Sequence, residues 1–194
     1  MENNLFVFLE CLVWARFNFK GGLMAKLKAG EVVVKKDNTN SFLNAIKALK
    51  MSVKVGIPET ANSRPQDEGF DNMSNAAIGY IQENGSELAG IPPRPHLVPG
   101  IRNVQPQITE EFKKAAQEVF TDPSAVYKRY TRAGILAMNS VKALITSGEG
   151  FEKLSEATLK ERKEAGFKGT KPLLRTGQYR NAITYVIAPD KGII

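Results

Sequence analysis

The sequence predicts an α+β protein in which a small, mostly antiparallel sheet is packed by several helices. Residues 52–58 and 183–188 follow a two-residue period of apolar side chains, which is typical of half-buried strands. Between these two segments, apolar residues recur every three or four positions in several stretches, and the longest covers about 124–147. The 194 residues are 42% hydrophobic and 24% charged, which suits one globular domain with its own core.

The first 23 residues differ from the rest of the chain. Residues 5–15 are strongly apolar but too short to cross a bilayer as a helix, and an acidic start without a small-residue cleavage site does not fit a signal peptide. The codons for Lys20-Gly21-Gly22 can form the purine run of a bacterial ribosome-binding site just before Met24. We therefore expect Met24 to be the true start, with 1–23 translated upstream or disordered and 24–194 forming one domain. The alternative for 1–23 is a membrane-associated or core-docking helix.

The first third of this domain is predicted to contain a strand, a helix, a second strand and a loop. Residues 31–36 (EVVVKK) are a short β-type run expected at a sheet edge. A helix over 41–50 follows the capping side chains of 38–40. Its apolar face comprises Phe42, Leu43, Ile46 and Leu49. The strand 52–58 ends at a proline, and the polar, aperiodic residues 59–72 are expected to form a long surface loop.

A stiff arm follows the next predicted helix, which covers 74–84 and stops at a glycine. Residues 91–95 read IPPRP, and their prolines fix φ at about −65° and remove backbone donors, so the segment is neither helix nor central strand. We expect an extended arm that holds Arg94 in a set direction, toward a neighbouring subunit or against the preceding helix. A rigid, donor-poor arm favours a contact surface. The predicted subunit or partner interface comprises Ile91, Pro92, Pro93, Arg94, Pro95, His96 and Leu97.

The rest of the chain is predicted to be mainly helical. One helix is marked by Ile108, Phe112, Ala115, Ala116 and Val119. Asp122-Pro123 then starts the longest helix, which ends at Gly148 and Gly150 and in which Gly134 permits the close approach of another helix. Its predicted buried stripe comprises Tyr127, Tyr130, Gly134, Ala137, Met138, Val141 and Leu144. A further helix is capped by Ser155 and ends at Gly166, and a single turn starts at Thr176-Gly177.

The sequence contains no set of residues that predicts a chemical reaction. Cys11 and His96 are the only cysteine and histidine, which excludes a disulfide framework and nearly excludes a Cys/His metal site. His96 lies between Pro95 and Leu97, where a packed, aromatic-type role is more natural than that of a general base. No nucleophile–base pair or nucleotide-binding motif is present. We therefore expect no enzyme, no cofactor and no metal.

The last third of the chain is basic. The formal net charge is +7, and eight basic residues stand against four acidic ones between Phe151 and Asn181. A solvated helix face with Lys/Glu pairs and a surface that faces DNA or an acidic partner both fit this composition. The residues that would form such a surface are Lys160, Arg162, Lys163, Lys168, Lys171, Arg175 and Arg180.

Two stretches resemble the tailed-bacteriophage neck and tail-completion proteins, also described as virion morphogenesis or minor tail protein Z-like. The first, 52–101, contains VKVGIPE, AAIGYIQENGS and GIPPRPHLVPGI, and the second, 154–187, reads LSEATLKERKEAGFKGTKPLLRTGQYRNAITYVI. Together they cover about half of the chain. The chain departs from the family pattern at three positions, where it has His96 for Phe, Tyr179 for Leu and Ala182 for Ser. The family order of the motifs further implies that 183–188 pairs antiparallel with 52–58.

This resemblance implies a structural virion protein without enzymatic turnover. Such a protein would oligomerise as a ring at the head–tail junction or tail end, and would act in tail completion and head–tail joining. Its partners would be phage connector and tail-terminator proteins, with genomic DNA passing through the lumen and making only non-specific contact. It would be found in the virion, and in the host cytoplasm during assembly, without a membrane partner. The alternative is a nucleic-acid-binding protein that uses the basic C-terminal third.

Overall fold

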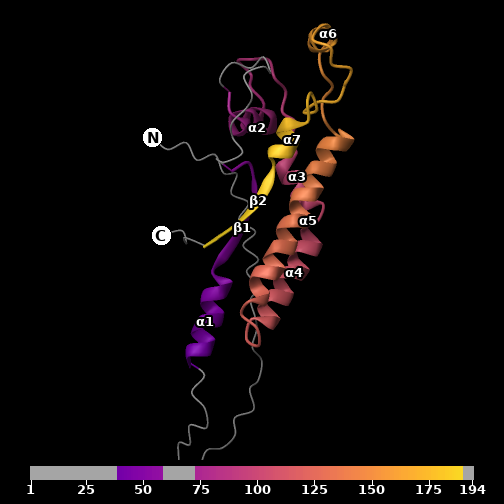
Figure 1. The fold of residues 1–194 in the computed structure, drawn as a ribbon. Coiled ribbons are helices and arrows are strands. Elements are labelled where there is room, and N and C mark those ends of the chain that lie inside the picture. The colour runs from indigo at the N-terminus through magenta and orange to yellow at the C-terminus, as the bar shows by residue number, and fades with distance from the viewer. Residues whose placement is uncertain (1–38, 59–72, 190–194) are drawn as a thin grey trace, which may run out of the picture.

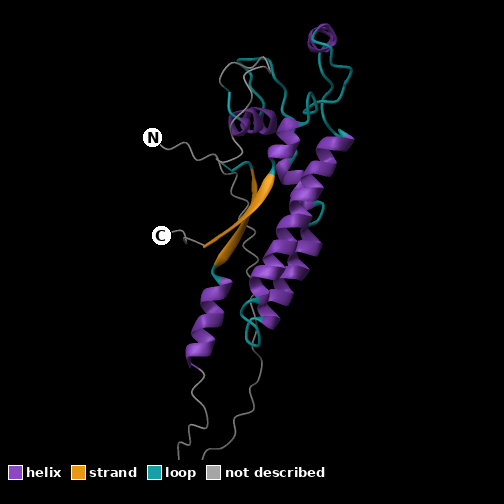
Figure 2. Ribbon diagram, viewed as in Figure 1, coloured by secondary structure: helices purple, strands orange, loops and turns teal. Residues whose placement is uncertain are grey.

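The computed structural model describes residues 39–58 and 73–189, which fold into an elongated α+β structure (Figure 1). Figure 2 shows helices along most of its length, with one short pair of strands beside them. In chain order, the elements are α1 Thr39–Leu49, β1 Met51–Gly56, α2 Asn75–Asn84, α3 Leu97–Arg102, α4 Gln105–Glu118, α5 Ala125–Ser147, α6 Glu156–Glu164, α7 Gln178–Ala182 and β2 Thr184–Pro189. The predictions for 1–23, 31–36 and 59–72 lie outside the described residues.

The two strands pair antiparallel, as the motif order implied. The register runs from Met51 opposite Pro189 to Gly56 opposite Thr184, which joins segments from opposite ends of the described chain. In β1, Met51, Val53 and Val55 pack against the core clusters at every second position, and in β2 Ile187 packs against them. A two-stranded sheet is marginal by itself, so its packing against α5 is what stabilises it.

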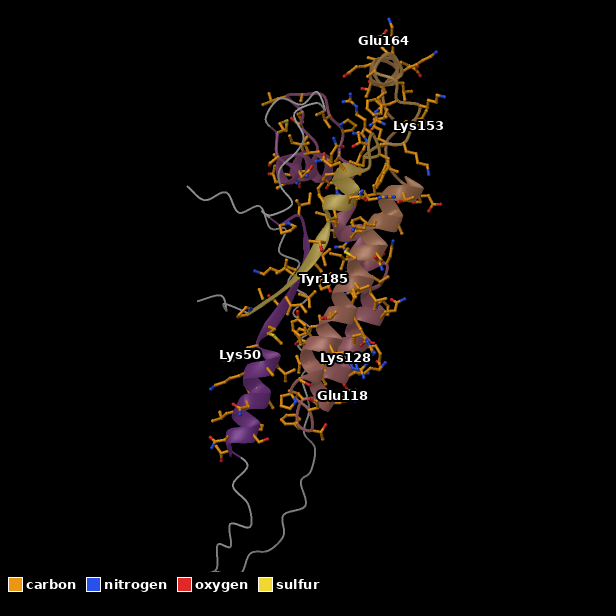
Figure 3. All side chains as sticks on the ribbon, in the orientation of Figure 1. Lys50, Glu118, Lys128, Lys153, Glu164 and Tyr185 are labelled. Atoms are coloured by element: carbon orange, nitrogen blue, oxygen red, sulfur yellow. The ribbon has the colours of Figure 1, made fainter. Side chains whose placement is uncertain are left out.

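Helix α5 organises the core. The buried residues form three small clusters, each of which contains residues of α5, and α4 packs along it as the other half of a helical hairpin. Near the turn that joins α4 to α5, Arg129 of α5 binds Glu118 and Glu111 of α4. The hydrogen bond from Arg129 lowers the pKa of Glu118, which Figure 3 labels. The helix ends at Gly148, whose φ of 72° is left-handed, as predicted.

The buried face of α5 differs in part from the predicted stripe. The buried residues are Ala125, Val126, Tyr130, Ala133, Gly134, Ala137, Val141 and Ile145. The prediction that Tyr127 is buried was wrong, because that side chain is 61% exposed, and Met138 and Leu144 are only half-buried. The stripe is rotated because α4, α3 and the sheet cover α5 from several sides. The small side chains of Ala133 and Ala137 therefore face the closest neighbours.

The apolar face predicted for the first helix is largely uncovered. In α1, Ala45 is buried and Leu49 is half-buried, whereas Phe42, Leu43 and Ile46 are exposed. The ring of Phe42 stacks on Phe120, with 6.0 Å between centroids. Helix α1 meets the body along one narrow side only, so a helix whose apolar arc is wider than that contact leaves part of the arc in solvent.

Gly134 lets β2 approach α5 closely, so the close approach predicted for this glycine is made by a strand and not by a helix. A Cβ placed at Gly134 would lie 2.6 Å from Cγ of Tyr185, a residue of β2 that Figure 3 labels beside α5. Only the absence of a side chain allows the two elements to meet here.

We predict that Gly134→Val destabilises the fold by about 1–3 kcal/mol, because the added side chain must push Tyr185 and β2 away from α5. Urea denaturation followed by circular dichroism measures the effect. Gly56→Ala in β1 is the matched control, since nothing lies within 4 Å of the position of its added methyl group. Equal stability of the two variants would contradict the close packing.

Candidate interaction site

The arm predicted as an interface is fixed from behind by Glu83, near the end of α2. One carboxylate oxygen of Glu83 accepts the backbone N–H groups of His96 at 2.8 Å and Leu97 at 3.0 Å, and the other accepts that of Val98 at 3.2 Å. These are the first donors of α3, which has no side-chain cap of its own. Glu83 therefore supplies the cap from another helix. No role for Glu83 was predicted from the sequence, and the helix α3 that it caps was not predicted either.

His96 is completely buried at the centre of a polar network. Its Nδ1 lies 2.8 Å from the carbonyl oxygen of Arg94 and 3.1 Å from the carboxylate of Glu83, and its Nε2 lies 2.5 Å from the hydroxyl oxygen of Tyr179. Burial lowers the pKa of His96, against the raising influence of the Arg94 carbonyl and Glu83, so the imidazole is neutral. Nδ1–H then donates to the Arg94 carbonyl, and the Tyr179 hydroxyl donates to Nε2.

Tyr179 completes this network from α7. Burial, followed by the charge of Glu83, raises the pKa of Tyr179, so its hydroxyl remains protonated. Its ring packs edge-to-face on His96, with centroids 5.5 Å apart. His96 and Tyr179 are two of the three positions at which the chain departs from the family pattern, and the structure brings them into contact.

Arg94 points into its own domain. Its side chain is 5% exposed, and it donates from Nε to the carbonyl of Glu152 at 2.9 Å, from Nη2 to that of Lys153 at 3.4 Å and from Nη1 to the side chain of Gln82 at 3.2 Å. Of the two orientations considered from the sequence, bracing the preceding helix is the one observed. The expectation that Arg94 contacts a neighbouring subunit is therefore corrected, because its guanidinium is buried within its own chain.

Fewer than the seven predicted residues are therefore available to contact another molecule. Arg94, His96 and Leu97 are buried inside the chain's own core, whereas Pro93 and Pro95 are exposed. Ile91 and Pro92 are half-buried. This alternation follows from the extended backbone, which turns successive side chains to opposite sides. Only the outward side of the arm can contact another molecule.

The turn before the arm presents a more prominent feature. Ser86 and Ile91 exchange two backbone hydrogen bonds of 2.8 and 2.9 Å, which close a tight turn over 87–90. Leu88 at its tip is fully exposed, and its neighbour Glu87 is also exposed and has no ion-pair partner among the described residues. No residue of this turn was predicted from the sequence as a contact residue.

The basic stretch folds as a projecting lobe, defined here as residues 151–176. Helix α6 within it buries no residue and stands apart from the main body, where Figure 3 labels Lys153 and Glu164. Ser155 accepts a hydrogen bond from the N–H of Thr158, and Gly166 has a left-handed φ of 83°, as predicted for the two ends of this helix. The lobe is thus a well-capped helix with little apolar anchoring.

Four of the predicted basic residues bind their own chain. Arg162 donates to the carbonyls of Gly169, Lys171 and Leu174, at distances between 2.9 and 3.4 Å. Lys171 donates to the Thr146 carbonyl at 2.6 Å. Arg180 donates to the Thr146 hydroxyl, and Arg175 lies over the ring of Phe167 at 4.6 Å. These residues organise the lobe and its junction with α5.

Lys163 and Lys168 are exposed beside an open cleft in the lobe, while Lys160 faces Glu164 at 4.0 Å. The cleft has a volume of about 450 Å³. It is lined by Leu159, Lys163, Gly166, Phe167, Lys168, Gly169 and Thr170. Two apolar side chains next to two lysines suit an apolar group that carries a negative charge beside it.

Two further findings concern the described residues alone. Residues 39–58 and 73–189 contain no helix that is long and apolar enough to cross a membrane. Within the same ranges, no group of three or more histidine, cysteine, aspartate or glutamate side chains could hold a metal ion.

We predict that acid destabilises the fold through His96. The folded pKa lies below the usual value of about 6.5, so the stability from the neutral imidazole is present above pH 6.5 and is lost as the pH falls toward the folded pKa. The free energy of unfolding should therefore fall between pH 7 and pH 5, and His96→Phe should show a shallower slope. Chemical denaturation at several pH values measures both slopes. Identical slopes would contradict a buried neutral His96.

We also predict that Arg94→Ala acts on folding. The change leaves the carbonyls of Glu152 and Lys153 without their donor and should cost about 2–3 kcal/mol of stability. Amide hydrogen exchange of the lobe should increase more than that of α5. Arg102→Ala at the end of α3, where the side chain is exposed, is the control. An unchanged exchange pattern in the Arg94 variant would show that the lobe does not depend on this anchor.

No protein-family model matches the chain, and no curated protein or solved structure is significantly similar to it. The function is therefore inferred from the residues of this chain and from their arrangement. The features that matter are the fixed arm, the exposed turn before it, and the lobe with its cleft.

Proposed function

We propose that this chain is a structural protein of a tailed-bacteriophage virion, which forms rings at the head–tail junction or at the tail end. Its partners would be copies of itself, connector proteins and tail-terminator proteins, and it would act by surface complementarity. It would occur in the virion and, during assembly, in the host cytoplasm. The proposal rests first on the two motifs of the sequence that resemble the neck and tail-completion proteins.

One structural observation supports treating the two motifs as a single signature. The strand β1 of the first motif pairs with β2 of the second, and His96 of the first bonds Tyr179 of the second. The contact between two departures from the pattern also gives them a shared physical explanation, because each supplies the other's hydrogen-bond partner.

The alternative role in binding nucleic acid is less well supported. Of the seven predicted basic residues, Arg162, Lys171, Arg175 and Arg180 are engaged within the chain. Binding to phosphates depends on several cations presented together, each of which releases counterions. Lys160, Lys163 and Lys168 are the exposed cations that remain from the predicted set. Three exposed lysines favour no more than weak, non-specific contact with DNA.

We predict that the purified chain forms ring-shaped oligomers, either alone or when mixed with connector and tail-terminator proteins of the same phage. Electron microscopy and light scattering would detect the rings. A lysate that lacks this chain should contain separate heads and tails, and adding the purified chain should restore infectious particles. A chain that neither assembles nor restores joining would contradict the proposal. Specific DNA binding that weakens steeply with salt would instead favour the alternative role.

A further inference from the structure

We propose that the turn at Glu87-Leu88 of one copy docks into the cleft of the lobe of the next copy. This inference rests on the proposed ring, and it names the surfaces that join neighbouring subunits. Glu87 and Leu88 are called the knob below, and the cleft is the one lined by Leu159, Lys163, Phe167 and Lys168.

The knob is a rigid projection with an apolar tip. Its turn is closed by the paired backbone bonds of Ser86 and Ile91, and the proline arm that follows limits its motion further. A projection already held in one conformation loses little freedom when it binds. A single exposed leucine is common on protein surfaces, so its exposure alone would carry no conclusion. What distinguishes Leu88 is that the knob matches the cleft.

The cleft complements the knob in both polarity and charge. Leu159 and Phe167 provide apolar surface for the side chain of Leu88, and a volume of about 450 Å³ accommodates it. Lys163 and Lys168 provide positive charge for Glu87. Lys163 and Lys168 have no ion-pair partner among the described residues, so docking would not break an existing pair. Opposite charges around an apolar contact set the register of an interface.

The knob and the cleft are formed by different segments of the chain. The knob follows α2, and α2, α7 and α6 lie at the same end of the molecule in Figure 1. Leu88 is fully exposed, so it does not occupy the cleft of its own chain. Such a contact is head-to-tail when each copy offers its knob to one neighbour and its cleft to another, and repeating it closes a ring when the rotation between copies allows closure. The occupant proposed for the cleft is therefore a second copy of this chain.

Cross-linking between two differently tagged chains tests the contact directly. Both chains carry Cys11→Ser, which removes the one native cysteine. One then carries Leu88→Cys and the other Lys168→Cys, and copper phenanthroline serves as the oxidant in the mixture. We expect a disulfide between the two chains. The matched control replaces Lys168→Cys by Lys160→Cys, on the same lobe but outside the cleft lining, and should give little cross-link. Equal or no cross-linking in both mixtures would overturn the proposal.

A charge exchange tests the same contact without cysteines. Glu87→Lys should weaken self-association about tenfold or more, and Lys163→Glu with Lys168→Glu should do the same, because each places like charges together. The three changes in one chain should restore association. Sedimentation equilibrium measures it, with Lys160→Glu as the control. Failure of the triple variant to recover would contradict the pairing of these charges.

These experiments distinguish a failure of the knob–cleft contact from a failure of the proposed function. A wild-type chain that forms rings unaffected by any of these variants would refute the knob–cleft contact and leave the ring protein in place. A wild-type chain that restores tail joining but forms no ring, either alone or with the connector and tail-terminator proteins, would refute the contact between copies as well. A chain that does neither would refute both. Loss of DNA retention in the lysine variants, with association unchanged, would assign the cleft to nucleic acid and so refute the docking of a second copy.

Discussion

The carboxylate of Glu83 accepts the first three backbone N–H groups at the start of α3, and the end of the molecule around α2, α3 and α7 depends on that contact. A buried helix start without partners is costly, and α3 brings no capping side chain. By filling this role from α2, Glu83 fixes the direction of the arm. His96 then meets Tyr179, and the two halves of the sequence signature become one unit.

The rest of the fold depends on α5, which the three small core clusters share. No single cluster is large, so stability is distributed along one helix and its contacts with α4, α3 and the sheet. This arrangement explains why Gly134 matters beyond its size. It is the point at which the sheet approaches the one helix common to all parts of the core.

Features that depend on local chemistry could be predicted from the sequence. Features that depend on packing against distant segments of the chain could not. Glycines located the C-terminal ends of α5 and α6, Ser155 located the start of α6, and the period of the two strands located β1 and β2. The predicted cap at Asp122 does not hold for α5, whose N-cap is Ser124 without a side-chain bond. The exposed face of α1, the rotated stripe of α5 and the inward direction of Arg94 depend on neighbours that no local pattern specifies. The same holds for Glu83, whose three donors lie 13 to 15 residues further along the chain. Three residues of the predicted interface, Arg94, His96 and Leu97, are therefore buried inside the chain.

The way in which the lobe is attached affects which substitutions the protein can accept during evolution. Arg94 holds the lobe through the carbonyl groups of residues 152 and 153, and every amino acid supplies a carbonyl. Substitutions at Glu152 and Lys153 therefore leave the tether intact. Because α6 buries no residue, its outer surface is also free of packing constraints. The lobe can thus be remodelled toward new partners while its attachment remains the same.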